Sequence, residues 1–449
     1  MTGRPDRTRR GVLGLGGATA LAALGALGGL AGCGQDGAGG GAPTGPGGAP
    51  AAISFMSRDS GSDLEPYKQG IARFNAAQSR VKVAHDIVTG NFEQKLQTVV
   101  AGGTPPDVTY MHSQNIPTFG VAGVTGPLDA YLKRDKAALD GLLPAAVDSY
   151  RWQGALHGVP DVATSLVMFV NRGLFEKAGV PLPTEKWTWA EYLSAAQRLT
   201  NAGRDQGTFG AVDFNGGFPR FTVLWQNDAD LLNKDRTAVA VDRPEAVEAI
   251  GWIADQMLKA RVHASPADLE GRSAEAFFLE GRAAMIPIIS SRMGIVAKGA
   301  QFDVEVVHLP QGKKRVTRVA CGGVAMYRGT KAPDASWDLL KFWATEDFQW
   351  LISRAGGIIF PAHKKVAESP ELFASGPFPK QPRVTVDAMA YARTEPYTVR
   401  YTDLVAAWNK EMDTVWKGES AVKDALTRAK AAMDPVLLEA VAQSKAQGK

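Results

Sequence analysis

Hydrophobic and polar positions follow two different periods from residue 51 onward. The apolar run "AAISFMS" and the alternating stretch "RVKVAHDIV" both predict strands. Between them, Tyr67, Ile71 and Phe74 are apolar at spacings of four and three, which predicts a helix. A second helical pattern and a third short strand follow before residue 112. Strands that alternate with helices in this way predict a parallel sheet covered by helices.

The rest of the chain continues this mixture of helices and strands. Thr188 and Glu191 form a capping box at the start of an expected helix over residues 189–200. No repeat of 20 to 50 residues is visible, which argues against a solenoid or a propeller. We expect further helices in residues 244–258, 273–281, 333–345, 346–356, 401–418 and 421–433, and further strands in residues 167–170, 282–288, 302–310 and 317–327.

Residues 1–32 have the pattern of a targeting segment. The pair Arg9-Arg10 precedes residues 11–32, which carry no charge, and together they resemble a twin-arginine export signal. A membrane-spanning helix is the alternative, because about 20 apolar residues can cross a bilayer. Eight glycines in residues 11–32 weaken that alternative, since each costs a helix roughly 1 kcal/mol relative to alanine.

Cys33 ends the motif "LAGC", which resembles a bacterial lipobox. We expect acylation of its thiol, which would attach the exported protein to the outer face of the cytoplasmic membrane. Residues 33–51 are nearly all Gly, Ala and Pro and are expected to form a flexible tether, because such a composition buries too little surface to fold. The other cysteine, Cys321, is expected to pack as a small apolar side chain.

The net charge of +4 comes mainly from the targeting segment. Residues 1–32 hold four arginines and one aspartate, a net +3, so the remaining chain carries about +1. A nucleic-acid partner would call for a basic patch, and the charge gives no support for one.

Motifs of known chemistry are absent from the sequence. There is no H-E-x-x-H, no Walker A loop and no G-x-S-x-G, and the six histidines show no metal-ligand spacing. We therefore expect no catalytic residues, no cofactor and no metal. With 46 acidic residues, a glycoside hydrolase with paired carboxylates remains the alternative.

The order and spacing of several stretches carry a resemblance that spans nearly all of residues 52–433. They include "FEQKLQTVVAGGTPPDV", "LHGVPDVATSLVMFVNRGLFEKAGV", "AFFLEGRAAM" and "GGIIFP". The chain resembles family 1 of the extracellular solute-binding proteins, which feed carbohydrates to ABC importers. A solute sensor that uses the same fold is a further alternative.

The resemblance implies an α/β fold of the periplasmic-binding-protein type, with two lobes that close on a ligand. Residues 52–160 and about 301–344 would form one lobe, and residues 161–300 and about 345–449 the other. The implied partners are a small carbohydrate and the transmembrane subunits of an ABC permease, and we expect a monomer.

Polar side chains follow the expected strands at the point where each strand ends. In parallel α/β sheets, ligands bind beyond the carboxyl ends of the strands. Arg58 and Asp59 follow the first strand, and His112 and Gln114 follow the third. These four residues are therefore candidate ligand contacts, and solvated loop residues are the alternative.

Five further candidates lie later in the chain. Trp225 sits among polar residues and could stack on a sugar ring, or it could pack in the core. Asp161 follows an expected hinge, Ser291 and Arg292 follow a strand, and Gly323 allows a close backbone approach. A solvated hinge carboxylate, a surface salt bridge and a bulge are the respective alternatives.

Overall fold

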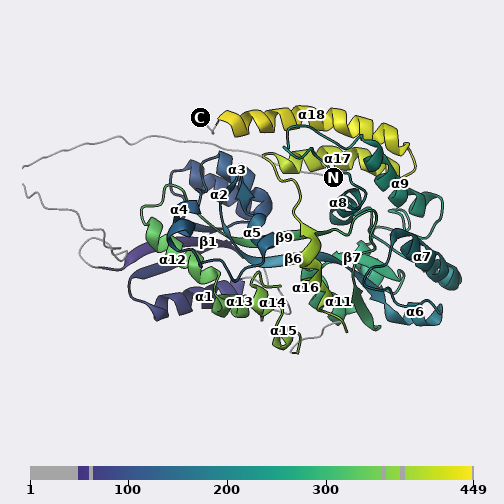
Figure 1. Cartoon of the computed structure of the whole chain (residues 1–449), viewed down its shortest axis with the longest axis horizontal. Coiled ribbons are helices and arrows are strands. Elements are labelled where there is room, and N and C mark those ends of the chain that lie inside the picture. Colours follow the sequence, from purple (N-terminus) through teal and green to yellow (C-terminus); the bar gives the residue numbers. More distant parts are fainter. Residues whose placement is uncertain (1–48, 60–63, 355–359, 375–379, 447–449) are drawn as a thin grey trace, which may run out of the picture. The chain divides into compact units, whose positions relative to one another are not determined.

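An eight-stranded mixed sheet runs through the computed structural model, which describes residues 49–59, 64–354, 360–374 and 380–446 (Figure 1). Its strand order is β2-β1-β3-β9-β6-β7, with β10 paired to β9 and β8 paired to β6, and β4 and β5 form a separate hairpin. The strands are β1 (Ala51–Arg58), β2 (Val81–Val88), β3 (Val108–Tyr110), β4 (Arg151–Trp152), β5 (Ala155–Leu156), β6 (Val159–Asn171), β7 (Met285–Ile289), β8 (Val304–Val307), β9 (Thr317–Met326) and β10 (Ala392–Arg393).

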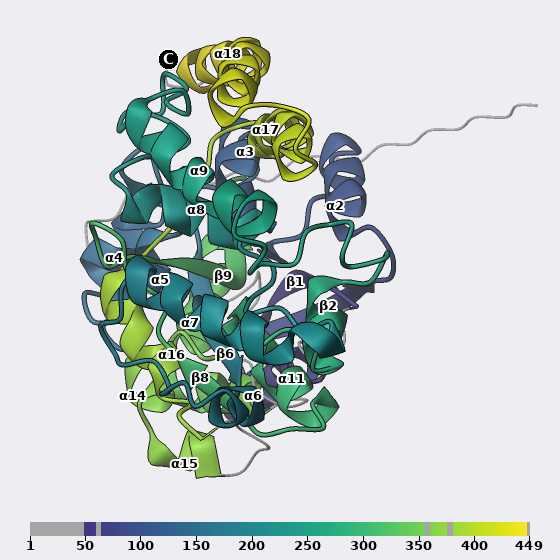
Figure 2. The same ribbon diagram turned by 90° about the vertical axis from the view of Figure 1, so that its right-hand side faces the viewer.

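Helices connect and cover these strands. They are α1 (Leu64–Ala77), α2 (Phe92–Ala101), α3 (Ile116–Val121), α4 (Asp129–Arg134), α5 (Pro144–Asp148), α6 (Arg172–Lys177), α7 (Trp189–Gly203), α8 (Gly217–Gln226), α9 (Pro244–Leu258), α10 (Ala274–Leu279), α11 (Met293–Gly299), α12 (Pro333–Trp343), α13 (Glu346–Ser353), α14 (Lys364–Ala367), α15 (Pro370–Ala374), α16 (Val384–Asp387), α17 (Tyr401–Trp416) and α18 (Val422–Ala446). The capping box expected at Thr188 and Glu191 is confirmed at the start of α7. Helices α17 and α18 pack side by side in both views (Figures 1 and 2).

The sheet is parallel at its beginning and antiparallel beyond, except that the short strand β10 pairs in parallel with β9. Strand β1 pairs in parallel with β2 and β3, which confirms the expectation from the alternating strands and helices. The pairs β3–β9, β6–β9, β6–β7 and β6–β8 are antiparallel. The α/β fold class expected from the sequence is confirmed.

One buried cluster, here called the N-terminal core, surrounds β1, β2 and β3. The Trp343 ring lies 5.3 Å from that of Phe55 and 4.2 Å from that of Phe348, between ring centroids. The hydroxyl-bearing ring of Tyr67 on α1 packs against Trp343 at 5.8 Å. Helices α1, α12 and α13 therefore bury their apolar faces together against the first strands.

Strand β6 passes from this core into two others. Val159 and Ala163 pack in the N-terminal core. Leu166, Met168 and Val170 face the cluster here called the C-terminal core, while Val167 and Phe169 face a third cluster on the opposite side of the strand. The strand is buried on both faces, which explains why residues 166–170 form a continuous apolar run.

Two boundaries differ from those expected from the sequence. Strand β8 was expected in the first lobe, but it pairs with the far half of β6, so the chain returns to the N-terminal core only along β9. Helix α13 was expected in the second lobe, but Phe348 packs in the N-terminal core. Periodicity predicts that these elements exist, but not which partner buries their apolar faces.

The helices of the described ranges include none that is long and apolar enough to cross a membrane. The expected signal segment, residues 1–32, lies outside the described residues, and so does Cys33.

Candidate ligand-binding site

Strands β3 and β10 pair with opposite ends of β9. Strand β10 pairs with Thr317 and Arg318, and β3 pairs with residues 324–326. Just after β3, the Met111 backbone N–H donates to the carbonyl oxygen of Gly323 at 2.8 Å. The residues that follow β3 therefore lie beside the middle of β9, where the chain passes between the N-terminal and C-terminal cores.

Arg318 is the centre of a buried polar cluster on β9. Its Nε donates to Glu395, which also accepts a hydrogen bond from the Tyr401 hydroxyl. Its Nη2 lies 3.5 Å from the Tyr397 hydroxyl oxygen. Burial by itself lowers the pKa of Arg318, but the Glu395 carboxylate outweighs this effect and the pKa is raised. The Nη1 atom is buried without an acceptor among the described residues.

Phe218, in the first turn of α8, lies against this cluster. The Arg318 guanidinium carbon is 3.9 Å from the centroid of the Phe218 ring, a cation–π contact. The Phe218 side chain is 42 % exposed, although Arg318 is only 2 % exposed. The half-exposed Phe218 ring and the buried Arg318 guanidinium therefore lie in direct contact.

His112, which follows β3, is a second potential hydrogen-bond donor. Burial, followed by the positive charges of Arg318 and Arg58, lowers the pKa of His112 to about 4, so the ring is neutral at pH 7. The Gln114 backbone N–H donates to His112 Nδ1 at 3.5 Å. Because Nδ1 accepts, the neutral ring carries its proton on Nε2, which is then a donor. Arg58 stacks nearby, 4.4 Å from the Tyr110 ring centroid.

Asp161 supplies a buried carboxylate close to the same strand ends. Its side chain is fully buried and accepts a hydrogen bond from the Tyr67 hydroxyl at 2.8 Å. A Cβ atom added to Gly322 would lie 3.4 Å from Asp161 Oδ1 and 3.6 Å from the Tyr110 ring. Gly322 therefore faces the group of Asp161, Tyr110 and Arg58.

Gly323, the candidate from the sequence, faces the opposite side of β9. A Cβ atom there would lie 2.3 Å from the Val159 carbonyl oxygen and 2.7 Å from the Tyr150 hydroxyl. The close backbone approach is therefore to β6 and not to a ligand. Successive residues of a strand point to opposite faces, so Gly322 and Gly323 have different neighbours.

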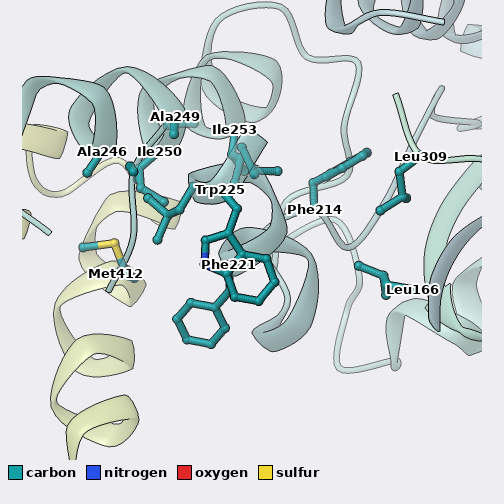
Figure 3. Close-up of a cluster of buried hydrophobic side chains, with 14 of the residues drawn as sticks. Leu166, Phe214, Phe221, Trp225, Ala246, Ala249, Ile250, Ile253, Leu309 and Met412 are labelled. Atoms are coloured by element: carbon teal, nitrogen blue, oxygen red, sulfur yellow. The ribbon is translucent and has the colours of Figure 1, made fainter. Parts of the chain in front are cut away.

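Trp225 is buried in the C-terminal core and presents no open face (Figure 3). The side chain is 2 % exposed, and its Nε1 donates to Asp230 Oδ1 at 2.9 Å. The Arg393 guanidinium covers the ring at 4.5 Å from its centroid. The platform expected from the sequence assumed a loop, but residues 217–226 form α8 and turn Trp225 inward.

Arg292 and Ser291 lie in the turn that directly follows β7. Arg292 Nε and Nη2 donate to the two carboxylate oxygens of Glu275 at 2.9 and 2.6 Å. This bidentate pair occupies the fork that was expected to bind a ligand, so the salt-bridge alternative holds. Ser291 lies in the same 3-10 turn, η4 (Ser290–Arg292).

The two remaining candidates have peripheral places at the strand ends. Asp59 is exposed, and its backbone N–H donates to the Val88 carbonyl oxygen at 2.8 Å. Gln114 is half-buried in η2 (Ser113–Asn115), directly after His112. Of the strand-end candidates, Arg58, His112 and Asp161 thus lie closest to the Arg318 cluster.

Two charged groups flank the start of α8. Burial lowers the pKa of Arg220 to about 10, and it raises the pKa of Asp213 to about 7 against the opposing effect of Arg220. The Arg220 guanidinium donates to the side chain of Asn409 and, at 3.4 Å, to the carbonyl oxygen of Asn215. These bonds tie the first turn of α8 to α17.

Sequence reasoning missed Phe218, Arg318 and Glu395. An arginine inside an otherwise apolar strand was a usable signal for Arg318, because buried charges require a partner or a function. The phenylalanine in "GGFP" was a weaker signal, because a single aromatic residue does not reveal its exposure. Glu395 lies 77 positions away from Arg318, and nothing in the local pattern links them.

The described residues hold no group of His, Cys, Asp and Glu that could bind a metal ion. Two hollows of about 750 and 820 Å³ lie at other places, beside α18 and beside α14 and α16, and both include Asp148 and Arg236. Neither is lined by Phe218, His112 or Arg318. The candidate site therefore consists of hydrogen-bond donors, two carboxylates and one aromatic ring.

Comparisons with known proteins identify the family of the chain. Residues 59–350 match the family model described as bacterial extracellular solute-binding protein. A putative binding protein of Brucella abortus is 23 % identical over 345 residues, 72 % of this chain and 82 % of its own length. The maltotriose-binding protein of Pyrococcus abyssi is 25 % identical over 63 % of this chain and 60 % of its own length.

The fold also matches solved structures. The cyclic α-maltosyl-1,6-maltose binding protein from Arthrobacter globiformis superposes with a TM-score of 0.74 at 22 % identity, covering 87 % of this chain and all of the other.

Proposed function

Because the chain belongs to the bacterial extracellular solute-binding protein family, we propose that it is the substrate-binding lipoprotein of an ABC importer. It captures a sugar or oligosaccharide and delivers it to the transmembrane permease. The observation that carries the proposal is the convergence of His112, Arg318 and Phe218 beside β9.

These groups suit a neutral carbohydrate. Arg318 is balanced by Glu395, so the cluster offers directed donors without a large excess of charge. His112 Nε2 and Arg318 Nη1 can donate to hydroxyl oxygens, at about 1 kcal/mol net for a neutral hydrogen bond and 1.5–3 kcal/mol for a charged one. With a stacked ring, a few such bonds reach the roughly 8 kcal/mol of micromolar affinity.

The supporting segments come from both cores. His112 and Arg58 follow strands of the N-terminal core, whereas Phe218 begins a helix of the C-terminal core. A ligand bound by both sets would favour closure of the expected lobes, because it contacts both only when they are close.

Export is a property of the family, and the lipid anchor at Cys33 is our proposal from the sequence. The tether of residues 33–51 would hold the binding domain near the permease. One acyl chain binds membranes weakly, so stable attachment calls for a lipid with more than one chain.

Two alternatives share parts of this site. A glycoside hydrolase would need two carboxylates across the bond to be cleaved, about 5–10 Å apart. In the site, Glu395 accepts hydrogen bonds from Arg318 and Tyr401, and Asp161 accepts one from Tyr67. These bonds disfavour the use of the two carboxyl groups as the acid and the nucleophile of a hydrolase. A solute sensor would bind the same ligand without transport.

Calorimetric titration and thermal shift with glucose, maltose, maltotriose, arabinotriose and mannitol test the proposal. We expect micromolar binding of at least one ring sugar, a raised melting temperature and no release of hydrolysis products. His112→Ala should weaken that binding about fivefold, because one hydrogen bond is lost.

Leu438→Ala is the control and should leave the affinity unchanged, because Leu438 is 72 % exposed on α18, a helix that packs on α17 and α9. Absence of binding to every carbohydrate at millimolar concentration would overturn the proposed function, and catalytic turnover would favour the hydrolase.

A further inference from the structure

We propose that the hollow beside α18 is a second binding site, separate from the site around Arg318, and that it takes a small organic phosphate. The hollow measures about 750 Å³, which is within the range of small-molecule sites in proteins. It is lined by the turn of residues 234–237, the hairpin β4–β5 and the last turns of α18. The inference goes beyond the proposed function and does not depend on which sugar the protein carries.

Arg236 is the central group of this hollow. It also lines the neighbouring hollow beside α14 and α16, so it is accessible from both. The side chain is half-buried, and its Nη1 donates to the Tyr397 carbonyl oxygen at 2.8 Å. Its remaining N–H groups can therefore donate to a ligand in the hollow.

Arg236 lacks a counter-ion among the residues that the structure describes. Burial lowers its pKa, the charge of Asp230 opposes this effect, and the charge of Arg393 adds to it. The Asp230 carboxylate is used elsewhere, because it accepts from Arg393 at 2.6 Å and from Trp225 Nε1 at 2.9 Å. Buried charges in proteins are ordinarily paired, so an anion bound here would supply the missing partner.

The backbone fixes the position of Arg236. Its φ of 56° lies in the left-handed region, which is uncommon for a residue other than glycine. The Asn233 side chain accepts from the backbone N–H groups of Thr237 and Ala238 at 2.8 and 3.0 Å, and the Arg236 N–H donates to the Asn233 carbonyl oxygen at 2.9 Å. Because the turn is fixed before a ligand arrives, less entropy is lost on binding.

The charges that line the hollow favour a doubly charged anion. They are four cations and two acids, a net +2, namely Arg151, Lys234, Arg236, Lys445, Asp148 and Asp235. Arg151 Nε lies 3.4 Å from the Asp148 carboxylate, so these two charges offset each other. Lys234 and Lys445 are exposed and form no ion pair within the described ranges. A phosphate monoester has about two negative charges at neutral pH and three acceptor oxygens, which matches this lining.

Apolar surface in the hollow suits an organic group on the phosphate. Leu437 and Val441 of α18 belong to the C-terminal core or pack against it, whereas Trp152 of β4 packs against the N-terminal core. Gln153 Nε2 donates to the Ser444 carbonyl oxygen at 3.3 Å and joins the hairpin to α18. Inorganic phosphate alone would leave this apolar surface uncovered, so it should bind less tightly than a phosphate ester.

Calorimetric titration of the intact protein with phenyl phosphate tests the proposal. Benzyl alcohol is the uncharged analogue, and inorganic phosphate is the analogue without an organic group. We expect phenyl phosphate to bind with a dissociation constant below about 1 mM, and each analogue to bind at least tenfold more weakly.

Two variants remove the proposed cations. Arg236→Gln should weaken phenyl phosphate binding at least tenfold, because a charged hydrogen-bond donor is lost. Since this change also affects the bond to Tyr397, the double variant Lys234→Gln/Lys445→Gln provides a second test that leaves the turn intact. It should weaken binding at least threefold, because both lysines are exposed and act only through their charge.

Arg261→Gln is the matched control. Arg261 also has a left-handed backbone, with φ 52°, but it pairs with Asp268 at 3.2 Å and lines neither hollow. It should leave phenyl phosphate binding unchanged, and the melting temperatures of all variants report whether they fold.

Three outcomes would overturn the second site. They are absence of phenyl phosphate binding at millimolar concentration, unaltered binding in both cation variants, and displacement of phenyl phosphate by a ring sugar that the protein binds. None of them bears on the proposed function, which the sugar titrations test separately.

Discussion

From the sequence, single site residues could be proposed only where their position at the end of a strand pointed to them. The rule that ligands collect at strand ends singled out Arg58 and His112, and the positive charges of Arg318 and Arg58 both lower the pKa of His112. It could not separate exposed from buried aromatic rings, so Trp225 was selected and Phe218 was not considered. Exposure depends on tertiary packing, and the two rings lie only seven positions apart in the same helix.

The packing of Trp225 leads to a prediction about stability. Trp225→Phe removes the Nε1 donor to Asp230 and leaves a small void in the C-terminal core. We expect a loss of about 1–3 kcal/mol in the free energy of unfolding and a ligand affinity within twofold of the original. Urea unfolding and calorimetric titration measure the two quantities. A tenfold loss of affinity without loss of stability would return Trp225 to the binding site.

At the scale of elements, most strands and long helices followed from periodicity. The first three strands, α1, α2 and the capped helix α7 lie where the pattern placed them. Helix α8 was not among the expected helices, although Pro219 in its first turn is well tolerated there. Local pattern could not assign β8 and α13 to their partners, because those contacts are distant in sequence.

The two glycines of β9 give a matched pair for testing the facing of this strand. Gly323→Ala would place a methyl group 2.3 Å from a backbone oxygen of β6, and we expect a loss of about 1–3 kcal/mol of stability. Gly322→Ala meets its nearest atom at 3.4 Å and should stay within about 0.5 kcal/mol. Chemical denaturation of both variants measures the difference, and equal losses would contradict the assignment of faces.

For the molecule as a whole, the sequence predicted the α/β class and the family, and the comparisons confirm both. The lobe boundaries stay a prediction, and the buried clusters do not coincide with them, since β8 pairs with β6 and α13 packs in the N-terminal core. The cargo could not be predicted because the residues proposed to contact it, such as His112 and Arg318, belong to segments far apart in the chain.

The proposed anchor is tested at this scale with the two cysteines. Cys33→Ser should move the protein from the membrane fraction to the soluble fraction and leave ligand affinity within twofold, because the site lies far along the chain. Cys321→Ala is the control and should remain with the membrane, since Cys321 is buried in the N-terminal core. Retention of the Cys33→Ser variant in the membrane would favour a spanning segment in residues 11–32.

The path of the chain through its cores also sets the order in which the protein can fold. The N-terminal core includes residues from 319–352 as well as Ala362 and Met389, which a ribosome adds only after the whole intervening segment. Residues 51–163 therefore cannot bury all of their apolar surface while they alone have been synthesised. Pairings of such high sequence separation form slowly, so the nascent chain keeps this surface exposed until late in its synthesis and depends on protection from aggregation until β9 is in place.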